Sequence, residues 1–316
     1  MTATARKISI LSLLAVLGMT VFTLYKMGNS WEFALHYRAL KIAAIAIVSW
    51  CVAYSTIAFQ TLTNNRILTP SIMGFEAVFM LFQTLLVFIH GENSLQAVGT
   101  VGNFVISTLL MIGFAFLLYF LIYKRGVDNM FLLLLIGLVL GTLLNTLSSF
   151  LQLLLDPNNF FIVQGKMFAS FSNINQELLG YAFAIVAVVL LIGMRYTNRL
   201  DVLALGKNQA INLGLDYDKN IQMFLTLIAI MVAVSTALVG PVLFLGLLVS
   251  NLTYEILKTY KHHILIPACA LVTLIVLVGG QFLAERILKL STPISVIINF
   301  VGGIYFMYLL LKRKRI

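Results

Sequence analysis

The chain has 316 residues, of which 61% are hydrophobic and only 10% are charged, and its formal net charge is +10. Because a soluble domain carries about 25% charged residues, this composition excludes a water-soluble globular protein and indicates a protein that crosses the membrane several times. In that class a positive net charge is explained by basic cytoplasmic loops, and nucleic-acid binding is the less favoured explanation.

The amino-terminal segment contains Arg6 and Lys7, followed by an apolar run to about residue 25. A signal peptide has a similar order of features, but this run is about as long as a membrane span and no small-x-small cleavage site follows it. We therefore interpret it as a retained first helix, with cleavage as the minority alternative.

Ten segments are candidate membrane spans, because a helix needs about 20 apolar residues to cross the hydrocarbon core. The eighth is the weakest candidate, since it is short, carries Ser250 and Asn251, and follows Gly240 and Pro241, as a broken helix lining a cavity would. The sequence thus predicts an all-α, polytopic membrane protein with a single transmembrane domain over residues 1–316. The approximate spans are 8–25, 40–62, 71–90, 98–123, 130–155, 178–194, 220–239, 241–257, 264–284 and 294–311.

The distribution of basic residues orients these spans. With the amino terminus inside and ten alternating spans, the inner loops hold 15 Lys and Arg residues and the outer loops hold 6. Cytoplasmic loops are enriched in Lys and Arg, so both termini are predicted to be cytoplasmic. The same orientation places residues 203–220, the longest polar interruption in the second half of the chain, in the cytoplasm.

This cytoplasmic stretch reads LALGKNQAINLGLDYDKN. It is not a phosphate-binding loop, because that motif needs Gly at position 201 and Ser or Thr at position 208, where the chain has Asp201 and Asn208. Leu203, Gly206, Ala210 and Leu213 are spaced to share one face of a helix. We therefore expect a short helix over residues 203–214, whose apolar face inserts into a groove on a partner or rests on lipid.

The flanks of this helix carry their own signals. Gly214 is a plausible helix stop, and Asp218 is placed to cap the next span.

ALGKNQAINLGLDYDK resembles the ATPase-coupling loop of permease subunits of the iron-siderophore and vitamin B12 type of ABC importer. In that family a Leu-Gly, Ala, Leu-Gly pattern docks a short helix into a cleft on the ATPase. Three further segments resemble the same family: FQTLTNNRILTPSIMG, with Gln60, Pro70 and Gly74 in register, GPVLFLGLLVSNLTYEIL, and the tail VIINFVGGIYFMYLLLKRKR. The coupling positions that match are Leu205, Gly206, Ala210, Leu213 and Gly214.

Three departures from the family pattern favour one of its branches. Ser250 and Asn251 stand where the family commonly has Pro-His, and Asn64 and Asn65 stand where it has Asn-Pro. A Gly-x-Pro near the end is replaced by Gly-Gly-Ile at residues 302–304. These forms resemble the branch that imports ferric siderophores such as petrobactin, enterobactin or anguibactin, and they weaken a vitamin B12 assignment.

The resemblance implies a permease of the bacterial plasma (inner) membrane that forms half of a dimeric pore for a ferric siderophore. Its partners would be ABC ATPase subunits, an extracytoplasmic substrate-binding protein and a second permease, identical or different. ATP and Mg²⁺ would be bound by the ATPase, with no cofactor on this chain. The alternatives are a heme or corrinoid importer, an ATP-independent secondary transporter, which would need ionisable residues near the midplane, and an intramembrane enzyme.

Basic residues on the outer side are candidates for docking the binding protein. The family places an Arg-x-x-Arg at the start of its second span and a further Arg after its ninth, and the matching residues are Arg38, Lys41 and Arg286. Lys lacks the bidentate fork of Arg, so Lys41 is the weakest of the three. Arg38 and Lys41 could instead anchor a helix end at the lipid headgroups.

Polar side chains inside the spans are candidates for lining the pathway, although Asn and Gln more often hold helices together. The hydroxyl-rich segment 142–152 is the best lining candidate, with Asn145, Ser148, Ser149 and Gln152 near one face. Glu76, an acid inside a predicted span, lies near a helix start and could face headgroup water. The candidate lining residues are Gln60, Asn145, Ser149 and Gln152.

No catalytic or metal-binding pattern is evident in the sequence. His262 and His263 are adjacent, so they point in different directions on a helix, and we interpret them as part of a solvated basic loop. We find no nucleotide-binding motif, no Ser/His/Asp arrangement and no metal-ligand spacing. The sequence therefore predicts a transport subunit rather than an enzyme.

Overall fold

The computed structural model describes residues 3–25, 31–123, 130–172, 174–287 and 293–313. Throughout these residues the secondary structure is helical, with no strand. Within these described ranges, eight helices are long and apolar enough to cross a membrane. They are α1 (Ala3–Leu24), α2 (Trp31–Leu62), α3 (Phe75–His90), α5 (Thr100–Tyr123), α6 (Met130–Leu153), α8 (Gln176–Arg195), α11 (Tyr217–Val239) and α13 (His262–Phe282).

The ten predicted segments are completed by the short helix α12 (Leu245–Leu257) and by α14 (Ile294–Arg313), whose apolar part runs only from Ile294 to Tyr308. The prediction of an all-α membrane protein is confirmed, and α12 is short, as the sequence indicated. The remaining elements are connectors: η1 (Pro70–Met73), η2 (Gly91–Asn93), α4 (Ser94–Val98), α7 (Pro157–Lys166), α9 (Thr197–Leu203), α10 (Lys207–Asn212) and the π-helical turn η3 (Leu283–Ile287).

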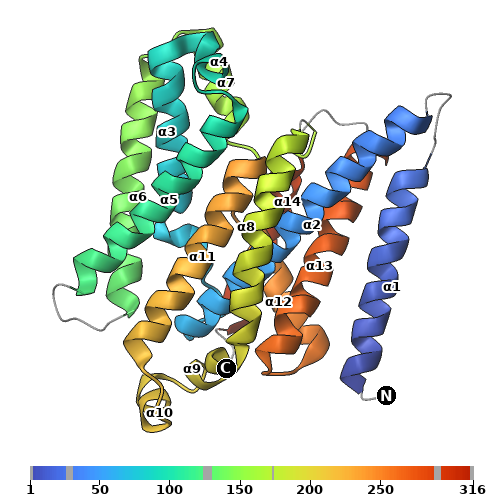
Figure 1. Ribbon diagram of the computed structural model, residues 1–316, viewed down its shortest axis with the longest axis vertical. Helices are drawn as coiled ribbons and strands as arrows, with labels where there is room; N and C mark the ends of the chain where they lie inside the picture. The colour runs from blue at the N-terminus through green and yellow to red at the C-terminus, as the bar shows by residue number, and fades with distance from the viewer. Residues whose placement is uncertain (1–2, 26–30, 124–129, 173, 288–292, 314–316) are drawn as a thin grey trace.

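Helix α2 forms the centre of the bundle, and α8, α11, α12 and α13 pack around it (Figure 1). Its apolar and small side chains occur on all sides, which is typical of a fully enclosed helix. Ile45, Tyr54 and Phe59 are completely buried. The packing at Tyr54 is so close that a Cβ atom on Gly193 of α8 would lie 2.5 Å from its ring. By contrast, α1 and α6 leave most of their apolar surface exposed.

Helix α3 begins later than the sequence predicted, because Gly74 separates it from η1. Gly74 has a φ of +85°, a conformation that L side chains rarely adopt. It also packs directly on α6, where a Cβ atom at this position would lie 2.8 Å from the Cα of Gly141. Gly137 and Gly141, four residues apart on α6, thus form a small-residue surface that admits the backbone of residues 73–74.

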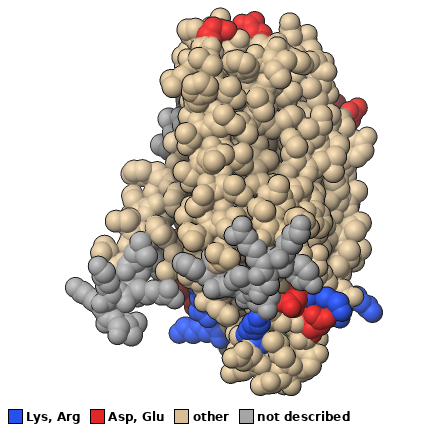
Figure 2. Space-filling view, turned by 90° about the vertical axis from the view of Figure 1, so that its left-hand side faces the viewer, with Lys and Arg blue, Asp and Glu red and all other residues tan. Residues whose placement is uncertain are grey.

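The two ends of the molecule differ in charge. Helix α1 begins at the same end as α9 and α10, whereas α4 and α7 lie at the opposite end (Figure 1). On the face shown in Figure 2, Lys and Arg side chains gather near the lower end, which holds α9 and α10. The arrangement agrees with the predicted orientation, in which both termini are cytoplasmic.

Candidate functional site

The cytoplasmic stretch between α8 and α11 contains two short helices, so the predicted single helix over residues 203–214 is wrong. Helix α9 ends at Leu203 and α10 begins at Lys207. Gly206 lies between them with a φ of +96°, which a continuous right-handed helix cannot contain. The spacing argument failed because it treated Gly206 as a helical position, whereas its backbone turns the chain between the two helices.

This break also divides the face that the sequence analysis assigned to a partner, because Leu213 is exposed and the other two side chains with a Cβ atom are buried. Leu203 and Ala210 are buried against the rest of the chain, with exposures of 2% and 0%. The exposed apolar side chains are Leu205, Ile211 and Leu213, at 53%, 48% and 64%. We call these three residues the coupling patch. The sequence analysis missed Ile211. Ile211 follows the buried Ala210 in α10, so the two side chains point to different sides of this helix.

The capping residues of this region match the sequence in part. Gly214, with a φ of +82°, follows the end of α10 as predicted. The cap of α11 is Asp216 rather than Asp218, because its carboxylate accepts a hydrogen bond from the backbone N–H of Lys219 at 3.2 Å. Hydrogen bonds from the side chain and backbone of Lys219 hold the pKa of Asp216 below its ordinary value.

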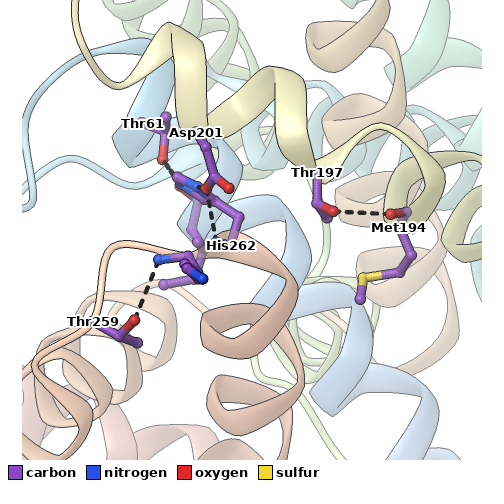
Figure 3. Close-up of polar contacts among 8 residues, drawn as sticks. Thr61, Met194, Thr197, Asp201, Thr259 and His262 are labelled. Atoms are coloured by element: carbon purple, nitrogen blue, oxygen red, sulfur yellow. Dashed lines mark hydrogen bonds and ion pairs between the residues drawn. The ribbon is translucent and has the colours of Figure 1, made fainter.

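The interpretation of His262 and His263 as a solvated loop is wrong for His262. His262 is the first residue of α13 and is 3% exposed. Its ring and backbone contact Asp201 of α9 and Thr61 of α2, as Figure 3 shows. His263 does lie on the surface. The sequence offered no signal for this pairing, because Asp201 and His262 are far apart along the chain.

The three predicted docking residues lie at the opposite end, near the junction of α2 and η3. Arg38 and Lys41 are each 5% exposed in the single chain. The guanidinium Nη1 of Arg38 donates to the carbonyl oxygens of Thr23 at 2.6 Å and Tyr25 at 2.9 Å. Arg286 lies in η3, a π-helical turn of the kind that is frequent at functional sites.

Lys41 forms an ion pair inside the chain that the sequence analysis missed. Its Nζ lies 2.5 Å from Oε1 of Glu285, and the two side chains are 7% and 22% exposed. The same oxygen accepts a hydrogen bond from the amide of Gln281 at 2.7 Å. These contacts join α2 to η3, so an ion pair links two elements at the end of the bundle that carries the predicted docking residues.

Removing one partner of this ion pair should destabilise the protein. Glu285→Gln leaves the Lys41 ammonium buried without a counter-ion, and breaking a buried pair costs about 3 kcal/mol or more. We expect a lower thermal unfolding temperature in detergent for Glu285→Gln. Adding Lys41→Met should recover part of the loss, and Glu92→Gln, at an exposed position, should have no effect. Equal unfolding temperatures for Glu285→Gln and the wild type would contradict this role.

The predicted lining residues separate into two groups. Gln60 is 2% exposed, and its amide nitrogen donates to the carbonyl of Arg66 at 2.8 Å and to Oγ of Ser250 at 2.9 Å. The amide nitrogen of Gln152 donates to Oγ1 of Thr84 at 3.2 Å, which joins α6 to α3. These side chains hold helices together within the chain, as Asn and Gln commonly do in membrane bundles.

Asn145 and Ser149, by contrast, lie on the exposed surface of α6. Thr142 and Thr146 are also exposed, so these residues, at spacings of three and four, form one polar strip along the helix. We call these four residues the α6 strip. Polar groups gain little from facing lipid hydrocarbon, so such a strip indicates contact with another helix or with water.

Glu76 lies in the first turn of α3, near a helix start as the sequence indicated, and its side chain is half-buried. Its Oε1 accepts a hydrogen bond from Oγ of Ser71 at 2.9 Å. It lines a small cavity of about 30 Å³ together with hydroxyl side chains that include Thr56 and Thr236.

Comparison with known proteins identifies the family. The model of the FecCD transport family matches residues 2–312, nearly the whole chain. The chain belongs to the FecCD transport family. This FecCD protein is 51% identical to the petrobactin import system permease protein YclO of Bacillus subtilis, over 98% of each chain. It is 33% identical to the petrobactin permease FatC of Bacillus anthracis, over 88% of this chain and 78% of FatC.

The fold of this FecCD protein matches a solved transporter. A metal-chelate type ABC transporter in an inward-facing conformation superposes with a TM-score of 0.85, at 22% identity, over 98% of this chain and 100% of the other. The predicted family and the predicted transport permease are therefore confirmed, and by its family the chain is a membrane-embedded transport subunit rather than an enzyme.

Proposed function

We propose that this chain is the permease subunit of an ABC importer that carries a ferric siderophore across the bacterial plasma membrane. The observation that carries the proposal is the 51% identity, over 98% of each chain, to a permease named for petrobactin import. The second petrobactin relative supports the same substrate class. A ferric siderophore of the petrobactin type is the substrate that we would test first.

The exposed surfaces support the partners that we propose. The coupling patch consists of three exposed apolar side chains at the cytoplasmic end, and an ABC ATPase would bind the permease there. ATP and Mg²⁺ would be held by that ATPase, and this chain would carry no cofactor and hydrolyse nothing. Residues 1–316 would act as one transmembrane domain, with α9 and α10 as its cytoplasmic contact.

The α6 strip supports a second permease, identical or different, on the other side of a shared pathway. Asn145 and Ser149 would contribute polar groups to that pathway. Ser148 and Gln152, which bond to Thr84, would hold α6 against α3 behind it. ATP-driven motion of the two permeases would expose the pathway first to the outside and then to the cytoplasm.

The docking of an extracytoplasmic binding protein would involve Arg38, Lys41 and Arg286. Because Arg38 and Lys41 already bond within the chain, acidic groups of the binding protein would have to compete with Glu285 and with the carbonyls at Thr23 and Tyr25. Docking would then loosen the junction of α2 and η3. Arg286 would be the basic residue that the binding protein meets with least rearrangement.

An uptake assay tests the proposed function. Iron-starved cells with and without this gene would be given radiolabelled iron as a panel of ferric siderophores, including petrobactin, alongside labelled heme and cobalamin. We expect the deletion to abolish uptake of one siderophore class and to leave heme and cobalamin uptake unchanged. Loss of heme or cobalamin uptake alone would overturn the substrate class, and uptake that persists after ATP depletion would favour a secondary transporter.

A further inference from the structure

A chain of buried hydrogen bonds joins α9 to two transmembrane helices at the cytoplasmic end (Figure 3). Oδ1 of Asp201, on α9, accepts from the backbone N–H of His262 at 2.9 Å and lies 2.5 Å from Nδ1 of the same residue. The other ring nitrogen, Nε2, lies 2.7 Å from Oγ1 of Thr61, near the end of α2. Three helices are thus connected through one imidazole ring.

The burial of this cluster makes its bonds costly to lose. His262 is 3% exposed and Thr61 is 7% exposed, and a buried polar group left without a partner costs about 1–3 kcal/mol. Asp201 also completes the start of α13. The N-cap residue of that helix, Lys261, makes no side-chain capping bond. The carboxylate of Asp201 instead accepts a hydrogen bond from the first turn of α13, a role that the N-cap side chain usually has.

The position of α9 places the cluster between α10 and the transmembrane helices. Helix α10 has one buried residue, Ala210, and is joined to α9 through residues 204–206. Helix α9 is anchored more firmly, because Leu200 is fully buried and Arg199 donates to Asn220 at the start of α11. A displacement of α10 would therefore reach the bundle through the contacts of α9 with α2 and α13 and through the bond from Arg199 to α11.

We propose that Asp201 is a positioning residue that, through His262 and Thr61, makes α9 move together with α13 and α2. The motion of an ATPase bound at the coupling patch would then reach the two most closely packed helices of the bundle. This inference rests on the proposed function, in which α9 and α10 are the ATPase contact. It adds the contacts through which movement of α9 would be transmitted to α13 and α2.

The test compares transport with ATP hydrolysis in the whole importer. Wild-type and Asp201→Ala complexes, purified with their ATPase and reconstituted in liposomes with the binding protein and the ferric siderophore from the uptake assay, would be assayed for both rates. We expect the ATPase to stay bound and to keep hydrolysing ATP, while siderophore transported per ATP falls at least about tenfold. Asp218→Ala, at an exposed position in the first turn of α11, should leave that ratio unchanged.

Two substitutions of His262 separate the two halves of the link. The amide nitrogen of Asn takes nearly the place of Nδ1, so His262→Asn keeps a donor toward Asp201. The longer Gln takes nearly the place of Nε2, so His262→Gln keeps the side-chain contact with Thr61 and loses the one with Asp201, whose bond to the backbone N–H of residue 262 remains in both variants. We expect His262→Asn to transport more siderophore per ATP than His262→Gln.

The outcomes distinguish this inference from the proposed function. A wild-type ratio in Asp201→Ala would overturn the inference, as would transport and hydrolysis that fall in parallel with the amount of assembled complex, because that is what a merely structural residue would do. A wild-type chain that binds no ATPase would instead overturn the proposed function, and this inference with it.

Discussion

Leu213→Arg is expected to abolish stable binding of the ATPase. Leu213 is the most exposed member of the coupling patch, at 64%, and it follows α10 directly. A buried apolar anchor at the centre of an interface is typically worth about 2 kcal/mol or more, so replacing it by a charge should weaken binding by at least about tenfold. Co-purification of the ATPase with tagged permease measures this, and uptake should be lost with it.

The matched control is Leu213→Met, which keeps an apolar side chain of similar volume at the same position. It should retain the ATPase at close to the wild-type level. Gly206→Arg would be a poorer test, because a φ of +96° makes any side chain there strain the backbone, whether or not a partner is bound. If Leu213→Arg and Leu213→Met retain the ATPase equally, the coupling patch is not the ATPase contact.

The second large effect is expected on the α6 strip. In the assembled importer, Ser149→Cys and Asn145→Cys should react with a membrane-impermeant, charged thiol reagent, because a transport pathway admits water. Modification at Ser149→Cys should then reduce siderophore uptake by at least about tenfold, since a bulky charge would stand in the pathway. The background should be low, because the native Cys51 and Cys269 are fully buried.

Val188→Cys on α8 is the control for this experiment. Val188 is 57% exposed and its neighbours on the surface of α8 are apolar, so we expect it to face lipid and to remain unmodified. Equal labelling of all three cysteines, or no labelling at Ser149→Cys with and without ATP, would exclude the α6 strip from the pathway.

The sequence alone determined the class of protein, the approximate spans and their orientation. These conclusions depend on local properties, namely about 20 apolar residues for each span and the side on which Lys and Arg gather, so they needed no knowledge of which helices touch. The family resemblance rested in the same way on short contiguous segments. The short α12 was also visible, because Gly240 and Pro241 interrupt the pattern locally.

Only the tertiary structure decided which side chains are available to partners. Exposure of Leu213 and burial of Ala210 depend on the turn at Gly206, whose positive φ cannot be read from a helical spacing. Lys41 with Glu285 and Asp201 with His262 pair across the chain, and a residue's neighbours along the sequence say nothing of such partners. On α6, Gln152 bonds to α3 whereas Asn145 and Ser149 stay exposed. This difference depends on which side of α6 packs against α3, and the sequence of α6 does not show it.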